Sequence, residues 1–381
     1  MDFNYSEEQL LVQKTAREFA AEQLAPGVAD RDEKMEFPAE QIKMLGEMGF
    51  MGMMVPEEWG GSGFDTVSYS LALEEIAKVD ASAAVPVSVN NSLVCALLYK
   101  YGTDDQKEKY LRKLATGEWL GAFSLSEPQA GSDASNLLTH AEKSGDQYII
   151  NGTKNWVSNG VNSNIAFVFA VTEKGAGHQG ITILAVTKGS DGFTTGKKEN
   201  KLGIRGSDTC ELYFDGCTVP VENRIAKEGD GFKIAMSVLD GGRIGIASQA
   251  LGIAQAALES AITYANERKQ FGKQISSFGA VKEKIAIMAT EITSARLLTH
   301  YAANLKDEEK PFSKESAMAK YYASEVAMSA ATECVQIFGG YGYMKDYGVE
   351  RLMRDAKITQ IYEGTSEIQK LVIARLMLEK T

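Results

Sequence analysis

A glutamate near the end of the chain stands in a setting that suits a general base. Glu363 lies between an aromatic residue and a glycine in the stretch IYEGTSEIQ, residues 361–369. Apolar residues recur at helical spacing directly after it, which predicts a helix entrance at this point. A carboxylate on such a turn can face a pocket, where burial raises its pKa and enables it to take a proton from a weakly acidic C–H. The alternative, and the commoner case for a single glutamate, is a solvated side chain that complements the helix dipole.

Hydroxyl groups, a proline and a glycine stand together in residues 123–133 (FSLSEPQAGSD). A loop of this composition can bind a flat group with polar edges through its amides and hydroxyls, and it can equally be a structural turn. Farther along, Trp156 and Ser158 are two residues apart in a strand-like run, so we expect them on the same strand face. The indole can stack on a ring while the hydroxyl bonds to its edge, although a tryptophan in a strand is more often part of the core.

Three segments in the C-terminal part of the chain have the composition of ligand-binding helix ends. Arg243 near the start of a long helical segment can grip phosphate or adenine, oriented by Asp240 one turn earlier, or can form a local surface ion pair. Residues 268–272 (RKQFG) close the same segment with two cations, either as a pyrophosphate clamp or as a complement to the helix dipole. Residues 336–342 (QIFGGYG) let the backbone approach a ligand closely, or merely cap a helix.

The elements that must position these residues fall into three parts. Residues 1 to about 120 are predicted to be helical, with a cap at Ser6. Short β-rich runs between 121 and about 225 predict a small antiparallel β domain, with turn pairs at 151–152, 159–160, 191–192 and 215–216. The helical period then returns in four long segments, which predicts a bundle. We therefore expect a mainly α fold with a central β domain, divided into an N-terminal α-helical domain (1–120), a middle β domain (121–228) and a C-terminal α-helical bundle (229–381).

Composition excludes several classes of protein. Lys and Arg number 40 against 51 Asp and Glu, and the net charge of -11 argues against a nucleic-acid surface. The four cysteines form no CxxC pair and the three histidines are scattered, so neither a disulfide framework nor a metal site is indicated. We expect neither a signal nor a transit peptide at the acidic N-terminus, and no membrane span, because no uninterrupted apolar run approaches the ~18 residues that span a bilayer. The glycine cluster at 60–63 follows no strand and is not a dinucleotide fingerprint. We expect a cytoplasmic protein without membrane insertion.

Six segments jointly resemble the acyl-CoA dehydrogenases. They are FSLSEPQAGSD (123–133), WVSNG (156–160), LDGGRIGIASQALGIAQ (239–255), ERKQFG (267–272), QIFGGYGY (336–343) and RDAKITQIYEGTSEIQ (354–369). The resemblance spans essentially the whole chain and includes SVNNSL at 88–93, which is similar to the short-chain, butyryl-CoA branch. It implies an all-α N-terminal domain, a β domain and a C-terminal four-helix bundle, assembled as a homotetramer that holds FAD between domains and subunits.

The resemblance also implies roles for individual residues. Glu363 would remove the α-proton of an acyl-CoA substrate while the β-hydride passes to the flavin, which gives a trans-2-enoyl-CoA. The implied cofactor-binding residues are Phe123, Leu125, Ser126, Gly131, Ser132, Trp156, Val157, Ser158, Arg268, Phe271, Gln336, Ile337, Gly339, Gly340, Thr365, Ser366 and Glu367. Of these, Arg268, Phe271 and 336–340 would come from a neighbouring subunit. The implied substrate-binding residues are Ser132, Asp240, Arg243, Gln249, Thr359 and Gly364, and no metal is implied.

Five positions refine the resemblance. Some branches carry their base on the long helix where this chain has Gly242, and glycine cannot serve, which strengthens Glu363. Gln249 and Thr359 match residues that narrow the pocket floor of short-chain members. Gln274 stands where many relatives have proline, and Gly279 stands where they have a flavin-contacting glutamine. The second difference puts one hydrogen bond to FAD in doubt.

The main hypothesis is an FAD-dependent short-chain acyl-CoA dehydrogenase that passes electrons to an electron-transferring flavoprotein. A carboxylate can remove an α-proton of a thioester only if the enolate is stabilised as it forms, so the thioester carbonyl must sit in a donor site. In relatives the donors are a flavin ribityl hydroxyl and the backbone N–H of the base. The alternatives are the same fold run reductively on an enoyl-CoA or aryl-propenoyl-CoA, an oxidase that uses oxygen, and a flavin-free helical scaffold.

Overall fold

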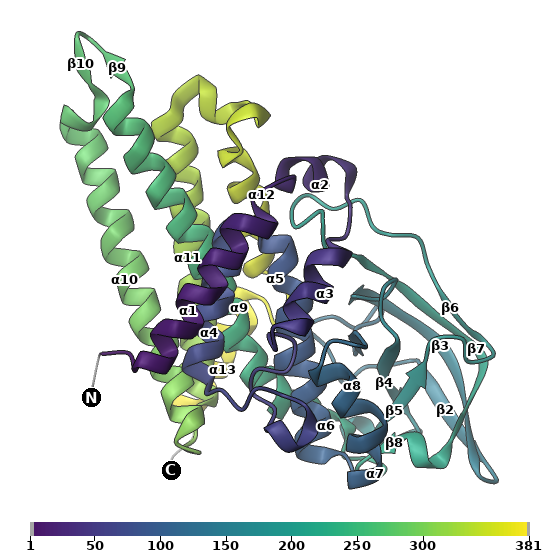
Figure 1. Ribbon diagram of the computed structural model, residues 1–381. Helices are drawn as coiled ribbons and strands as arrows, with labels where there is room; N and C mark the ends of the chain where they lie inside the picture. Colours follow the sequence, from purple (N-terminus) through teal and green to yellow (C-terminus); the bar gives the residue numbers. More distant parts are fainter. Residues whose placement is uncertain (1–3, 379–381) are drawn as a thin grey trace.

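The computed structural model describes residues 4–378, which run from helices through a sheet back to helices (Figure 1). In α1, Ser6 forms the predicted cap as a capping box with Gln9: the Ser6 side chain accepts from Gln9 N, and the Gln9 side chain accepts from Ser6 N–H. The N-terminal helices are α1 (Glu7–Phe19), α2 (Val28–Lys34), α3 (Ala39–Glu47), α4 (Thr66–Val79), α5 (Ala81–Ser88), α6 (Ala96–Tyr101), α7 (Asp104–Gln106) and α8 (Arg112–Ala115).

α5 and α6 form one helix, Ala81–Tyr101, because the residues between them continue it with π-helical geometry. This is the one helix within residues 4–378 that is long and apolar enough to cross a membrane, and 94% of its apolar window is buried inside the protein. Its two central amides are satisfied internally, since the Asn90 side chain donates to Met51 O at 2.8 Å and Asn91 to Phe50 O at 2.8 Å. The helix is therefore part of the protein core.

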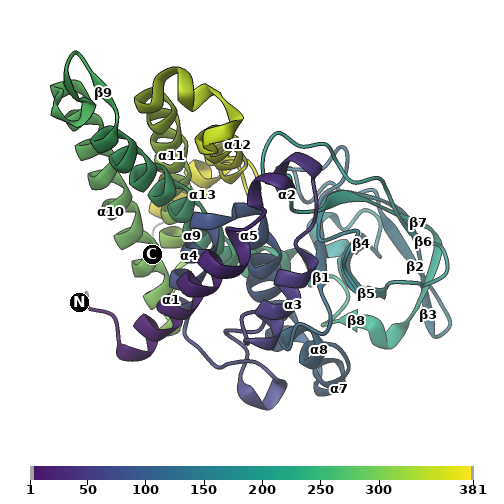
Figure 2. The ribbon, with the colours of Figure 1, turned by 45° about the horizontal axis from the view of Figure 1, so that its top comes forward.

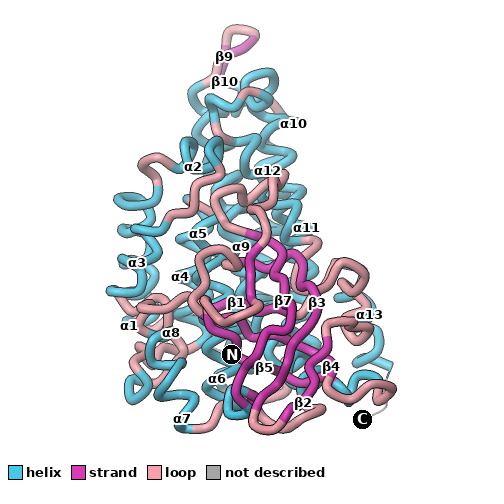
Figure 3. Tube along the Cα trace, turned by 90° about the vertical axis from the view of Figure 1, so that its right-hand side faces the viewer, coloured by secondary structure: helices cyan, strands magenta, loops and turns pink. Residues whose placement is uncertain are grey.

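The middle part is a twisted sheet that covers one side of the helices (Figure 3). Its strand order is β6-β7-β3-β2-β4-β5-β8, with β1 beside β4. Most neighbouring strands are antiparallel, as predicted, whereas β1 and β4 pair in parallel and β2 meets β4 in parallel at a single position. The strands are β1 (Gly121–Ser124), β2 (His140–Ser144), β3 (Gln147–Ser158), β4 (Ile165–Val171), β5 (Ile181–Thr187), β6 (Phe193–Thr195), β7 (Thr209–Pro220) and β8 (Arg224–Ile225).

Two of the four predicted turn pairs do not join strands. Asn159-Gly160 and Asp191-Gly192 lie in turns, but Asn151-Gly152 and Asp215-Gly216 lie inside β3 and β7. The two strands face each other there, and the side chain of Asn151 accepts a hydrogen bond from Gly216 N at 2.8 Å. A register shift falls between residues 150 and 152. A β-bulge needs the same permissive backbone as a tight turn, so the sequence pattern does not separate the two.

The C-terminal part confirms the predicted helical bundle (Figures 1 and 2). Its central member, α9, packs on α11, α4 and α10, and close approach needs small residues. A Cβ on Gly252 would lie 2.7 Å from Cβ of Ala77 in α4. The elements are α9 (Gly231–Glu267), the β9–β10 hairpin (Lys269–Gln270 and Lys273–Gln274), α10 (Gly279–Asp307), α11 (Ser313–Phe338), α12 (Val349–Thr359) and α13 (Ser366–Leu378).

The three parts share one hydrophobic core. Its largest cluster includes Leu97 of α6, Phe169 of β4 and Ala254 of α9, each fully buried. The sheet lies at one side of the molecule and the C-terminal bundle at the other, with the β9–β10 hairpin projecting at the far tip of the bundle (Figures 1 and 2). The turn that carries Glu363 connects α12 to α13. The predicted fold class, mainly α with a central β domain, is confirmed.

Candidate active site

A cavity of ≈ 880 Å³ lies where the helices meet the sheet. Segments far apart in the sequence form its walls: the helix 81–101, the loop after β1, the end of β3, residues 199–204, α9 and the turn after α12. Eight of its lining residues are predicted site residues outside the turn, and Glu363 lies across from them on the turn. The eight are Phe123, Leu125, Ser126, Gly131, Ser132, Trp156, Ser158 and Arg243. Gly364 and Thr365 complete the set.

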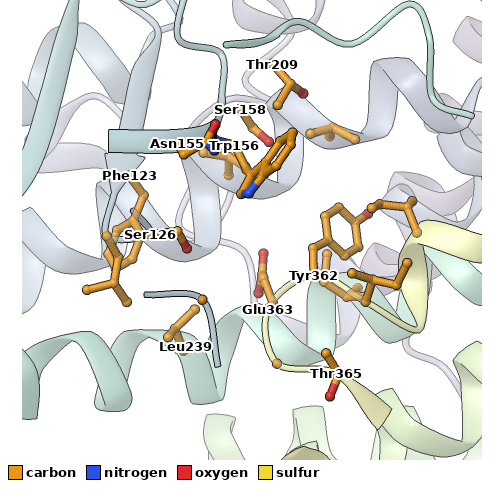
Figure 4. Close-up of a pocket in the computed structure, with 18 of the residues that line it drawn as sticks. Phe123, Ser126, Asn155, Trp156, Ser158, Thr209, Leu239, Tyr362, Glu363 and Thr365 are labelled. Atoms are coloured by element: carbon orange, nitrogen blue, oxygen red, sulfur yellow. Dashed lines mark hydrogen bonds between the residues drawn. The ribbon is translucent and has the colours of Figure 1, made fainter. Parts of the chain in front are cut away.

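Glu363 projects into the open centre of this cavity (Figure 4). Its backbone has a φ of 52° and that of Gly364 a φ of 89°, so the turn places two consecutive residues in the left-handed region. Its Oε2 is enclosed by protein and has no hydrogen-bond partner within residues 4–378. Burial raises the pKa of the Glu363 carboxyl to about 7, while Lys320 and Arg243 oppose the rise. The carboxyl is therefore poised to exchange a proton near neutral pH, and it is not the solvated glutamate of the alternative interpretation.

Gly242 of α9 lies directly against this carboxyl. A Cβ on Gly242 would overlap Oε2 of Glu363 and would lie 2.8 Å from Cδ2 of Leu93. The glycine therefore leaves the space that the carboxylate occupies. In some branches of the family this position carries the base. In this chain its glycine makes room for the base, Glu363.

Arg243 also lines the cavity, and it is buried, with 6% of its surface exposed. Its Nη1 donates to Asp240 Oδ1 at 2.6 Å, while its Nε has no partner within the described part of the chain. Asp240 does not line the cavity, and its other oxygen accepts from Ser313 Oγ. The pair is thus not a surface ion pair: Asp240 orients a guanidinium that retains a donor for a ligand.

The wall opposite Glu363 is built from two segments that are tied together. Lys154 has no exposed surface, and its Nζ donates to Leu125 O at 3.0 Å and to Glu127 Oε1 at 2.7 Å. The backbone N–H of Asn155 donates to Ser126 O at 2.9 Å. Residues 125–127 are therefore held against the end of β3. The loop is part of the cavity wall and not only a structural turn.

Trp156 belongs to the cavity wall and not to the core. It has a φ of 58° and is 61% exposed, at a point where the register between β3 and β7 shifts. Its ring faces the cavity across from Glu363 (Figure 4). Val157, predicted to contact the cofactor, is 2% exposed and does not line the cavity. With the hydroxyls of Ser126, Ser158 and Thr209 around it, the exposed indole fits a flat ring with polar edges, such as isoalloxazine.

The predicted pocket floor has a specific structure. Tyr362 lines the cavity, and its hydroxyl donates to Oε1 of Gln249. Nε2 of Gln249 in turn donates to Ala81 O at 2.8 Å. Gln249 and Thr359 are both fully buried and do not line the cavity themselves. Gln249 therefore acts on the cavity by holding Tyr362.

The remaining predicted cofactor-binding residues do not line this cavity. Ser366 and Glu367 lie in the first turn of α13, behind the Glu363 turn. The segments 268–271 and 336–340 lie together at the far end of the bundle, where the Arg268 guanidinium is 5.2 Å from the centre of the Tyr341 ring and Phe271 is 92% exposed. The residues of this group are Arg268, Phe271, Gln336, Ile337, Gly339 and Gly340.

Sequence reasoning missed several residues of the site. Leu93, Asn155, Thr209 and the segment 199–204 line the cavity, and Lys320 bonds to the turn from behind. Leu93 lies in the SVNNSL segment and Asn155 precedes Trp156, so both stand beside residues that were singled out. The segment 199–204 has no comparable pattern. Its place depends on a contact between Ile204 N and Asp355 Oδ1 at 2.5 Å, across 151 residues.

The chain belongs to the acyl-CoA dehydrogenase family. The family models described as the N-terminal, middle and C-terminal domains of acyl-CoA dehydrogenase match residues 6–118, 122–217 and 229–378. Membership of this family confirms the resemblance inferred from the sequence, the assignment as an enzyme and FAD as the cofactor.

Among relatives, the chain is 50% identical to a short-chain specific acyl-CoA dehydrogenase of Clostridium acetobutylicum, over 98% of this chain and 99% of the relative. It is 47% identical to an acryloyl-CoA reductase (NADH) of Anaerotignum propionicum, over 100% of this chain and 97% of the relative. Among solved structures, it is similar to butyryl-CoA dehydrogenase from Megasphaera elsdenii, with a TM-score of 0.98, 49% identity and full coverage of both chains. A chain from a study of the electron transferring flavoprotein of Acidaminococcus fermentans and flavin-based electron bifurcation gives a TM-score of 0.99 and 50% identity, again with full coverage of both chains.

Proposed function

We propose that the protein oxidises a short-chain acyl-CoA of butyryl size to the trans-2-enoyl-CoA, with FAD as cofactor and an electron-transferring flavoprotein as electron acceptor. The observation that carries the proposal is the Glu363 carboxylate, which has an enclosed, unpartnered Oε2 and faces Trp156 across the cavity. The relatives named for short-chain and butyryl-CoA substrates support the substrate class. The similarity to a chain from a study of an electron transferring flavoprotein supports the partner.

Glu363 is the base of the proposed reaction. Its carboxylate takes the proton from the α-carbon of the acyl group, and its raised pKa provides the proton affinity that this transfer needs. Gly242 keeps the carboxylate free to turn toward the substrate. Arg243 supplies a buried positive charge beside it and binds the CoA moiety, with Ser132 at the cavity mouth.

The backbone of the same residue is available to stabilise the enolate. Within residues 4–378 the N–H of Glu363 forms no hydrogen bond. A free N–H beside the base can donate to the thioester oxygen as negative charge develops on it. The strained turn therefore presents an acceptor for the proton and a donor for the oxyanion from one residue.

Bound FAD would supply the acceptor for the hydride that leaves the β-carbon. The residues proposed to hold its ring are Phe123, Leu125, Ser126, Gly131, Trp156, Val157 and Ser158, with Thr365, Ser366 and Glu367 beside the base. Val157 would act through its backbone, because its side chain points into the core. The Trp156 ring supplies a stacking surface and the serine hydroxyls supply hydrogen bonds to a polar ring edge.

The proposal includes a homotetramer in the cytoplasm, divided at residues 120 and 228 into the three predicted domains, without membrane insertion. The exposed Phe271 and the neighbouring pair of Arg268 and Tyr341 support an assembly in which this end of the bundle contacts another subunit. In that assembly Arg268, Phe271 and residues 336–340 bind the ADP part of FAD of the neighbouring subunit. Gly279 has open space around it and no side chain to add to this contact.

The experiment is an anaerobic titration of the purified yellow protein with acyl-CoA thioesters. Butyryl-CoA is expected to bleach the flavin absorbance fastest, compared with hexanoyl-, branched and aryl-propionyl-CoA. Bleaching by aryl-propionyl-CoA alone would overturn the substrate class. Rapid peroxide formation in air would favour the oxidase, and a colourless protein that cannot be reconstituted with FAD would favour the scaffold.

The reductive reaction is a second candidate, favoured by the similarity to an acryloyl-CoA reductase (NADH). The same residues would serve, because protonated Glu363 would then give its proton to the α-carbon. Reduction of crotonyl-CoA or acryloyl-CoA driven by a reduced flavoprotein, at a rate above that of butyryl-CoA oxidation, would make this the physiological direction.

A further inference from the structure

Lys320 of α11 is a buried cation directly behind the turn that carries Glu363. The whole residue has no exposed surface, and its Nζ donates to the backbone carbonyl of Gly364 at 2.7 Å. Burying a cation is unfavourable unless charge and hydrogen bonds compensate for the lost hydration. The hydrogen bond of Lys320 goes to a carbonyl oxygen, so the compensating negative charge must come from a group that it faces without touching.

The turn is held mainly from α11 and α13. Gln369 of α13 donates through Nε2 to the carbonyls of Glu363, at 3.1 Å, and Gly364, at 3.0 Å. Glu325, one turn along α11 from Lys320, accepts from Ser366 Oγ at 2.6 Å and from Gln360 Nε2 at 2.7 Å. Glu325 therefore fixes both ends of the turn, and Lys320 fixes its middle. This network keeps Glu363 in its unfavourable left-handed conformation.

Glu363 and Lys320 also act on each other electrostatically. Burial lowers the pKa of Lys320 to about 8, and Glu363 is the main group that opposes this shift. Burial raises the pKa of Glu363 to about 7, and Lys320 is the main group that opposes that shift. The other charged or titratable groups around the two are Arg243 from α9, Tyr69 from α4, Tyr362 beside the base, Glu325 from α11 and Glu367 from α13.

We propose that Lys320 is a positioning residue for the α-proton transfer: it fixes the turn that carries Glu363 and supplies a positive charge that favours the ionised form of this carboxylate before the substrate binds. Arg243 cannot replace it, because Arg243 lines the cavity, where a ligand would compete for its charge, and its Nη1 is already bonded to Asp240. Lys320 does not line the cavity, so its charge acts on the base whether or not a ligand is present. The inference rests on the proposed role of Glu363 as the base.

The test compares the pH dependence of kcat/KM for butyryl-CoA between the wild type and three FAD-loaded variants. In Lys320→Gln, a neutral donor replaces the cation, so the acidic limb of the profile is expected to move by about one pH unit toward higher pH. Lys320→Met lacks both charge and donor and is expected to show the same shift with a lower plateau of kcat. Lys320→Arg keeps the charge and is expected to keep the wild-type limb.

Lys306→Met is the matched control, because Lys306 is a partly buried cation whose pKa burial likewise lowers to about 8, but its charged neighbours are Asp307 and Lys100. Its profile is expected to keep the wild-type limb. An acidic limb that stays in place in both Lys320→Gln and Lys320→Met would overturn the proposal. FAD absorbance and thermal unfolding identify a misfolded variant. If Lys320→Met is misfolded, the pH profile of Lys320→Gln, the milder change, decides whether the proposal holds. Bleaching at the wild-type rate by Glu363→Gln would instead refute the proposed function, so the two failures are distinguishable.

Discussion

The Glu363 carboxylate fills the space that a side chain at Gly242 would need. A Cβ on Gly242 would lie 3.2 Å from the carboxyl carbon of Glu363 and would overlap its Oε2. Leu93 of the helix 81–101 borders the same space, so the carboxylate cannot move farther toward α9. The absence of a side chain on α9 is therefore as much a part of the candidate site as the carboxylate itself.

Gly242→Ala is expected to displace the Glu363 carboxylate without removing it. Because a misplacement of about 1 Å in a reacting group can reduce the rate about 10²-fold, we expect a loss of that order in the rate of flavin bleaching by butyryl-CoA. FAD content should stay unchanged, since Gly242 contacts Glu363 and Leu93. Stopped-flow absorbance measures the effect.

Gly241→Ala is the matched control for that variant. The nearest atoms to a Cβ at Gly241 are the Cε and Nζ of Lys306, both at 3.9 Å, so the methyl group fits. Replacing a glycine inside a helix by alanine should stabilise α9 by about 0.5–1 kcal/mol. Equal rates for the two alanine variants would show that the space beside Glu363 is not required.

The pH dependence follows from the raised pKa of Glu363. Oxidation requires the ionised base, so kcat/KM should fall about tenfold per pH unit as the pH drops below about 7. Reduction of an enoyl-CoA requires the protonated acid, so its rate should show the opposite dependence and fall as the pH rises above about 7. Measuring both directions on one preparation checks the assignment, and a limb near the ordinary pKa of glutamate would contradict it.

Gln249→Ala is expected to open the pocket floor, because Gln249 holds the Tyr362 hydroxyl and is itself held by Ala81 O. The ratio of kcat/KM for hexanoyl-CoA to that for butyryl-CoA should rise about tenfold or more, the usual value of a methylene in an apolar pocket. Tyr362→Phe, which keeps the ring but removes its hydroxyl, separates the position of the ring from its hydrogen bond. An unchanged ratio in Gln249→Ala would exclude Gln249 from chain-length selection.

Lys154→Met is expected to destabilise the protein by about 3–5 kcal/mol, because it leaves the Glu127 carboxylate buried without its cation. It also removes the hydrogen bond to Leu125 O, so the loop of the cavity wall should loosen and FAD should dissociate more readily. Urea unfolding and fluorescence of released flavin measure the two effects. The double variant with Glu127→Gln should recover much of the stability, and a double variant as unstable as the single one would refute the charge argument.

Local patterns in the sequence predicted most of the fold and the main residues of the site. Glu363, Ser126 and Trp156 lie in segments whose composition points to a ligand, and the structure brings them to one cavity. The helical period and the β-rich runs predicted the three parts, because each depends on spacing within a few residues. Trp156 and Ser158 both line the cavity, as their spacing predicted, whereas the register shift between β3 and β7 beside them has no signature in residue type.

Residues that act through distant contacts were not predictable in this way. Lys320 stands in the middle of a helix and bonds to a carbonyl 44 residues away, so nothing beside it in the sequence marks its role. The parallel pairing of β1 with β4 depends likewise on two segments about 40 residues apart. The bulge pairs at 151–152 and 215–216 resemble turn signals because both need the same backbone conformations.

The most direct test of the claim that Glu363 is the base is the Glu363→Gln variant. Glutamine keeps the shape and size of the side chain but cannot accept the α-proton. The variant should bind FAD and butyryl-CoA like the wild type, while flavin bleaching by butyryl-CoA should fall by at least the ~10²–10⁴ that a general base contributes. Glu118→Gln, which changes an exposed glutamate outside the cavity, should bleach like the wild type. Bleaching at the wild-type rate by the Glu363→Gln protein would contradict the account.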